Sequence, residues 1–69
     1  MAEKKMNPAR REMLSDLLDG PKTGAIHYPP NKWALEQGYA TKRDGKYGAI
    51  IFEITPAGRR ALDEATHDR

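Results

Sequence analysis

A short basic segment in the second half of the sequence carries side chains that can contact an anionic polymer. Lys42, Arg43 and Lys46 lie around a single acidic residue, Asp44, and Tyr47 follows directly. Cationic side chains neutralise phosphates, and a phenol ring can lie along a sugar-phosphate backbone, so these side chains predict a contact with double-stranded DNA. In the alternative interpretation, charges at a hairpin tip only keep edge strands from pairing with other chains, and Tyr47 covers the sheet.

A second group of candidate DNA-contacting residues precedes this segment. Asn31, Lys32 and Gln37 fall within one short stretch. Asn and Gln amides can pair with adenine in the major groove, and Lys can contact a phosphate. We therefore expect these three residues to enter the groove. Glu36 lies on the same side and would repel the backbone unless it accepts a hydrogen bond from cytosine.

Trp33 supports a different function. At about 100° per residue it falls on the helix side opposite Ala34 and Leu35, which should face the N-terminal helix. An exposed Trp33, together with Tyr28, could anchor a protein–protein interface, as in an adaptor or inhibitor. Alternatively, a short tilted helix folds Trp33 back over Ile26 or Tyr28 as core, because a small chain rarely spares a Trp from its core.

The residue types needed for catalysis or metal binding do not converge anywhere in the sequence. It has no Cys, its two His residues lie forty positions apart, and its Gly residues fall at caps and turns rather than in a phosphate-binding loop. No His, Asp and Glu cluster has metal-ligand spacing. We expect no enzyme activity, no cofactor and no metal.

Local signals place these residues on a helix, a second short helix and a hairpin. Asn7-Pro8 is a helix start and Gly20 a helix stop, so a helix is expected over residues 8–19. Its apolar residues recur at helical spacing and are Met13, Leu14, Leu17 and Leu18.

The stretch between this helix and Trp33 is short and rich in proline. Residues 23–28 predict either one helical turn or a short strand that pairs with the hairpin. Pro29-Pro30 predicts an extended conformation at Tyr28 and Pro29. A helix should begin at Pro30 or Asn31 and end with Gly38 as its cap.

A β-hairpin and a closing helix follow. Asp44-Gly45 predicts a two-residue turn with positive φ at both positions, between strands over residues 39–43 and 50–54. The second strand has one apolar face, formed by Ile50, Phe52 and Ile54.

Thr55-Pro56 is a helix start, so a helix is expected over residues 56–66. We expect its stripe of small residues to dock on the first helix. This stripe comprises Ala57, Ala61 and Ala65, with Leu62 beside it.

The amino-acid sequence of the hairpin and the helix after it resembles that of a known family. Gly38-Tyr39-Ala40, a basic turn and then residues 52–62, Phe-Glu-Ile-Thr-Pro-Ala-Gly-Arg-Arg-Ala-Leu, are similar to the wing and closing helix of winged helix-turn-helix domains. The phenolic-acid regulator and multiple-antibiotic-resistance regulator families have a similar sequence at this place. The resemblance implies an α+β winged helix, here with about three helices and a shortened second helix, in a small DNA-binding transcriptional regulator of bacterial or phage type.

Composition sets further limits. The 69 residues suffice for one small domain, expected over residues 1–69 with flexible ends at 1–6 and 67–69. The net charge is only +2, so DNA binding would depend on where the charges lie. No apolar run is long enough to span a membrane, and the lack of Cys fits a reducing compartment, so we expect a cytoplasmic protein. Many winged-helix regulators dimerise through helices outside the core, and this chain has no spare helix except its own ends, so we expect a monomer or a weak homodimer.

Overall fold

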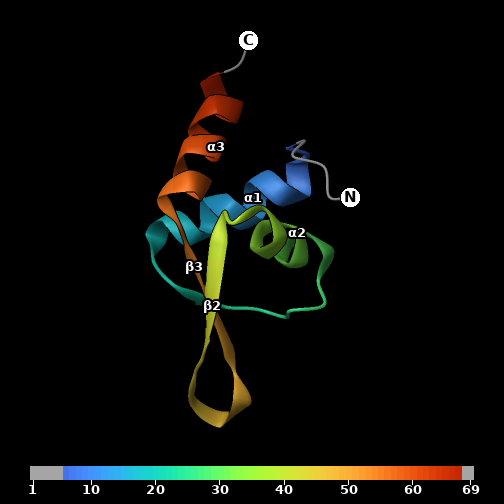
Figure 1. Ribbon diagram of the computed structural model, residues 1–69, viewed down its shortest axis with the longest axis vertical. Coiled ribbons are helices and arrows are strands. Elements are labelled where there is room, and N and C mark those ends of the chain that lie inside the picture. The colour runs from blue at the N-terminus through green and yellow to red at the C-terminus, as the bar shows by residue number, and fades with distance from the viewer. Residues whose placement is uncertain (1–5, 68–69) are drawn as a thin grey trace.

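Three helices and a three-stranded sheet form the part of the chain that the structure, a computed structural model, describes: residues 6–67 (Figure 1). In chain order these are α1 (Pro8–Asp16), a 3₁₀ turn (Leu17–Asp19), β1 (Lys22–Thr23), α2 (Pro29–Gln37), β2 (Ala40–Asp44), a second 3₁₀ turn (Lys46–Gly48), β3 (Ile50–Ile54) and α3 (Pro56–His67). The predicted α+β class, with three helices and a hairpin in the C-terminal half, is confirmed. Within the described residues no α-helix lies between α1 and α2, and the arrangement is consistent with a small winged-helix-like fold that lacks a second helix at this place.

The first helix forms where the sequence predicts it. The Asn7 side chain caps α1 by accepting a hydrogen bond from the Arg10 amide at 2.8 Å, and Pro8 occupies the first turn. After Asp16 the helix tightens into the 3₁₀ turn, and the amide of Gly20 donates to the Leu17 carbonyl at 3.1 Å. The expected helix over residues 8–19 is therefore present, with its last turn narrowed.

Residues 21–28 form a short strand and a turn before α2. β1 pairs antiparallel with β3, and the Gly24 amide extends this pairing by donating to the Ile50 carbonyl at 3.0 Å. Of the two alternatives for this stretch, the short strand is correct, although it lies at Lys22–Thr23. Tyr28 is extended as expected (φ −68°, ψ 125°).

The prediction for Pro29 is wrong, because α2 begins at this residue. Proline is tolerated in the first helical turn, where its missing amide would have no helical partner. The end of α2 is as expected. Gly38 has the left-handed conformation of a helix cap, with φ 76° and ψ 16°.

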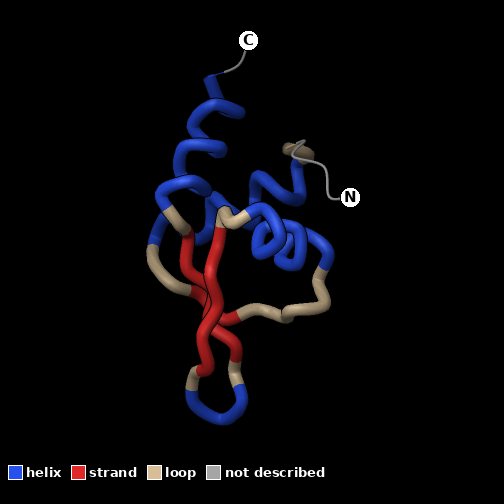
Figure 2. The backbone as a smooth tube through the Cα atoms, in the orientation of Figure 1, coloured by secondary structure: helices blue, strands red, loops and turns tan. Residues whose placement is uncertain are grey.

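The sheet has the order β1-β3-β2, with both pairings antiparallel (Figure 2). Ala40 lies opposite Ile54 and Lys42 opposite Phe52. Phe52 and Ile54 are buried whereas Glu53 between them is exposed, which confirms the predicted alternation along β3. One face of the sheet therefore supports the helices and the other faces outward.

The tip of the hairpin differs from the prediction of an Asp44-Gly45 turn. β2 continues to Asp44, which pairs with Ile50, so residues 45–49 form a five-residue connection. The Gly45 amide donates to the Ala49 carbonyl at 2.7 Å. Positive φ occurs at Tyr47 (60°) and Gly48 (77°), not at Asp44 and Gly45.

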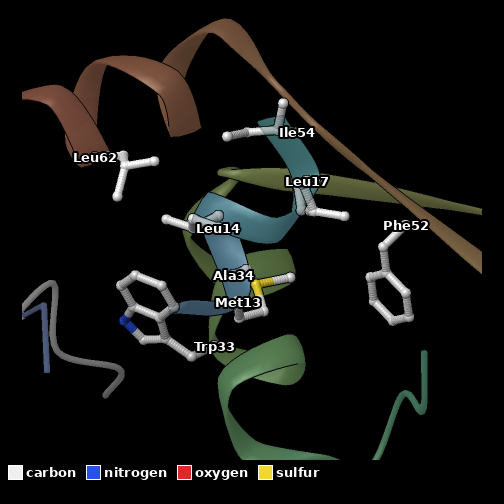
Figure 3. Close-up of a cluster of buried hydrophobic side chains, with 9 residues drawn as sticks. Met13, Leu14, Leu17, Trp33, Ala34, Phe52, Ile54 and Leu62 are labelled. Carbon is white, nitrogen blue, oxygen red and sulfur yellow. The ribbon is translucent and has the colours of Figure 1, made fainter. Parts of the chain in front are cut away.

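The core lies between the three helices and the inner face of the sheet (Figure 3). Leu14 and Phe52 are its most deeply buried large side chains. All three helices and both long strands contribute to it. Its members are Met13, Leu14, Leu17, Trp33, Ala34, Ala40, Phe52, Ile54 and Leu62.

The start of α3 is tied to the corner between α2 and β2. The predicted cap Thr55 accepts from the Gly58 amide at 3.0 Å, and its hydroxyl donates to the Gly38 carbonyl at 2.7 Å. The Thr55 amide also donates to the Tyr39 carbonyl at 3.0 Å. Gly58 packs so closely that a Cβ atom on it would collide with the Tyr39 carbonyl oxygen. Gly58 is therefore required here for close approach.

The predicted face of α3 is partly wrong. The helix contacts α1 as expected, but Ala57 is exposed, and within residues 56–65 the buried residues are Gly58 and Leu62. The close contact at Gly58 sets this rotation of the helix. Ala61 and Ala65 are half-buried at its side.

The expected flexible ends fall mostly outside the described residues. Within them, Met6 packs against the core and α3 continues to His67. In residues 6–67, no helix combines the length and the apolar character that crossing a bilayer requires.

Candidate nucleic-acid interface

The hairpin formed by residues 40–54, here called the wing, projects away from the three helices (Figure 1). Lys42, Arg43, Lys46 and Tyr47 all lie on it and are all exposed. The structure therefore brings four of the predicted DNA-contacting residues together on one projection.

The three cationic side chains of the wing, Lys42, Arg43 and Lys46, differ in their surroundings. Arg43 donates through Nη1 to Oε1 of Glu53 at 2.9 Å, and both side chains are more than half exposed. Such a pair contributes little to stability but places an acid beside the guanidinium. Lys42 and Lys46 make no ion pair within the described residues. They are the wing cations with no acid bound to them.

A further lysine beside the wing, Lys22, was missed in the sequence; it lines a pocket that also contains Glu12 and Asp16 of α1. It pairs with Phe52 on one side of β3, and Lys42 pairs with Phe52 on the other. Residues directly opposite each other in antiparallel strands point to the same face, so the two lysines lie on the Phe52 face of the sheet, one on each side of β3 and about 10 Å apart. The possible short strand near Thr23 was the available signal, but only the pairing register identifies Lys22.

Tyr47 has an unusual backbone and a fully exposed side chain. Its φ of 60° and ψ of 32° lie in the left-handed region, which typically costs a non-glycine residue about 1–2 kcal/mol. The ring does not cover the sheet, so this alternative is wrong. A strained, exposed aromatic residue at the end of a projection is a candidate contact residue.

Asn31 is not available to read bases, which corrects the prediction. It is only 7% exposed, and its Nδ2 donates to the Ala25 carbonyl at 2.8 Å. This hydrogen bond holds the loop before α2 against the start of the helix. The same carbonyl also accepts from the Tyr28 amide at 3.2 Å, so the Asn31 side chain adds a second hydrogen bond to this turn.

The exposed stripe of α2 carries mixed charge. Pro29, Lys32 and Glu36 are exposed at helical spacing, whereas Gln37 is half-buried. Lys32 can reach a phosphate, but Glu36 lies one turn away on the same stripe. Helix α2 therefore offers one phosphate contact and little means of reading sequence.

Trp33 is part of the core, so of the two alternatives for this residue the exposed contact is wrong. It is 3% exposed, the Arg10 guanidinium lies 4.7 Å from its ring centroid, and the Tyr39 ring meets it edge-on at 5.3 Å. The core alternative is correct, with Arg10 and Tyr39 as neighbours in place of Ile26 or Tyr28. Tyr28 itself is 51% exposed.

The structure also bears on metal binding. Among residues 6–67, no three His, Cys, Asp or Glu side chains gather closely enough to hold an ion.

Comparison with known proteins does not assign the chain to a family. No protein-family model, curated protein or solved structure matches it. The functional argument therefore depends on the geometry of this chain alone.

Proposed function

We propose that the protein binds double-stranded DNA through its wing, as a small transcriptional regulator of bacterial or phage type in the cytoplasm. The observation that carries the proposal is the grouping of Lys22, Lys42 and Lys46 on and beside an exposed hairpin that ends in Tyr47. Cations spaced along a projection suit the regular charges of a phosphate backbone.

In this mechanism, phosphate contacts dominate. Lys22, Lys42 and Lys46 neutralise phosphates beside the wing, Tyr47 lies along the sugar-phosphate backbone, and Lys32 of α2 adds a further contact. Because the Asn31 amide is bound to the Ala25 carbonyl, base recognition is weak. Affinity should therefore vary little between DNA sequences.

The burial of Trp33 removes the reason for the alternative function, a protein-binding module anchored on this side chain. A side chain that is 3% exposed offers almost no surface to a partner. DNA binding is the function that the exposed side chains support best.

The test is fluorescence anisotropy with a labelled 20-base-pair duplex of random sequence over a range of KCl concentrations. Four lysine contacts predict a slope of log K against log[salt] of about −3.6, which weakens binding about 100-fold between 50 and 200 mM. Several fixed sequences should agree within about tenfold. Absence of binding at 50 mM KCl contradicts DNA binding, and a preference of 1,000-fold or more for one sequence contradicts the phosphate-dominated mechanism.

A further inference from the structure

The tip of the wing, residues 45–49, is a closed loop at the end of the hairpin farthest from the helices (Figure 1). Two backbone hydrogen bonds close it. The Gly45 amide donates to the Ala49 carbonyl at 2.7 Å, and the Ala49 amide donates to the Lys46 carbonyl at 3.1 Å. Tyr47 lies inside this loop, so the loop sets the direction in which its side chain leaves the backbone.

The backbone conformation of Tyr47 is one that other residue types adopt more easily. Its φ of 60° and ψ of 32° lie in the left-handed region, which Gly and Asn tolerate best. Two glycines, Gly45 and Gly48, lie in the same loop, yet this position carries a tyrosine. A local cost without any gain in burial is typical of a residue that serves a contact outside its own chain.

The ring of Tyr47 is free to stack. Its side chain is fully exposed, and within residues 6–67 it makes no ring contact, hydrogen bond or ion pair. Lys42 and Lys46 beside it have no ion pair in the same part of the chain. An open aromatic face next to unpaired cations suits a planar ring that is attached to an anionic backbone, which is what a nucleotide offers.

A continuous duplex does not offer such a ring to the wing. Each of its bases is covered by the bases above and below it, so Tyr47 can reach only the sugar-phosphate backbone there. An unpaired base has an open face. Stacking of a base on an aromatic side chain strengthens binding whatever the identity of the base, because every base has a π-face.

We propose that Tyr47 stacks on an unpaired base, so that the protein prefers double-stranded DNA with a bulged base or a single-stranded overhang over continuous duplex. Lys42 and Lys46 neutralise the phosphates beside that base. The preference is about tenfold at a fixed salt concentration, which is within the range that one stacked base contributes. The proposal rests on the proposed DNA binding and names the DNA structure that the wing recognises.

The test compares three labelled duplexes by fluorescence anisotropy in 50 mM KCl. One is continuous, one carries a central bulged adenine, and one carries an abasic nucleotide at the same bulge. The two bulged duplexes have the same phosphates and differ only in the base. The wild type should bind the adenine bulge about tenfold more tightly than the abasic bulge, and the abasic bulge and the continuous duplex should agree within about threefold.

Two variants at one position separate the ring from the rest of the wing. Tyr47→Phe keeps the ring and should keep the preference. Tyr47→Leu keeps an apolar side chain on the same left-handed backbone but removes the ring, and should bind the two bulged duplexes equally. With 2-aminopurine as the bulged base, fluorescence should fall when the wild type or Tyr47→Phe binds, because stacking quenches it, and should stay nearly unchanged with Tyr47→Leu.

Equal affinity of the wild type for the adenine and abasic bulges would overturn the stacking proposal and leave phosphate-dominated DNA binding intact. A preference that persists in Tyr47→Leu, or 2-aminopurine fluorescence that the wild type does not change at saturation, would overturn it as well. Absence of binding to all three duplexes would contradict stacking and the proposed function together. Circular dichroism of each variant confirms that it is folded, so that a lost preference cannot reflect unfolding.

Discussion

The corner between α2 and β2 and the tip of the wing are both chain reversals, yet they are held in opposite ways. At the corner, the Tyr39 amide donates to the Ala34 carbonyl at 2.9 Å. The Tyr39 carbonyl accepts from the Thr55 amide, and Gly58 packs against this Tyr39 carbonyl. At the wing tip, two backbone hydrogen bonds close the loop, and Tyr47 contributes no burial. Residues that determine the fold are therefore separate from the exposed residues of the proposed DNA interface.

The largest effect should come from the core. Trp33→Ala removes a buried indole and is expected to lower the free energy of unfolding by about 3–5 kcal/mol, enough to unfold much of a domain this small. Urea titration followed by circular dichroism measures the change. Tyr28→Ala is the matched control, because Tyr28 is half exposed, and should change stability by about 0.5 kcal/mol or less. Equal losses in the two variants would contradict the placement of Trp33.

The next effect compares two glycines. Gly58→Ala forces a methyl group into the Tyr39 carbonyl and should cost about 3 kcal/mol. Gly48→Ala meets no atom but retains a φ of 77°, so it should cost about 1 kcal/mol. Thermal unfolding of both variants measures the difference. A larger loss of stability in Gly48→Ala than in Gly58→Ala would mean that the wing tip is the more constrained of the two chain reversals.

Thr55 provides a smaller test of the corner. Thr55→Val keeps the branched shape but removes the hydroxyl that bonds Gly58 and Gly38, and should destabilise the protein by about 1–2 kcal/mol. Thr41→Val on exposed β2 is the control and should be close to neutral. The two midpoints in urea should therefore differ clearly, and coinciding midpoints would refute the role assigned to the Thr55 hydroxyl.

The smallest effect has the opposite sign. Tyr47→Asn places a residue that tolerates the left-handed conformation at a strained position, so it should stabilise the protein by up to about 1 kcal/mol. The same variant should weaken DNA binding, because the exposed ring is lost. Stability comes from urea unfolding and affinity from anisotropy. Unchanged DNA affinity would remove Tyr47 from the proposed interface.

Local signals in the sequence were sufficient for much of the fold. Asn7-Pro8, Gly38 and Thr55-Pro56 marked helix ends correctly because capping depends on residues adjacent in the chain. The alternation along β3 was also readable, because burial on one face of a strand has a period of two.

The candidate site was harder to predict, because it depends on contacts between distant segments. The burial of Trp33 requires Arg10 and Tyr39 from other elements. The role of Asn31 depends on the Ala25 carbonyl, six residues earlier, which accepts from the Asn31 side chain as well as from the Tyr28 amide. Likewise, the length of the wing-tip loop depends on the strand register, which carries Asp44 into β2 and brings Lys22 beside the wing.

The central claim is that the wing serves binding and the body serves folding. It is tested most directly by measuring both properties in one variant, Lys22→Ala/Lys42→Ala/Lys46→Ala. We expect its free energy of unfolding to stay within about 1 kcal/mol of the wild type, while the slope of log K against log[salt] for duplex DNA becomes shallower by about 2.7 units. An unchanged slope and affinity in the folded variant would contradict the account.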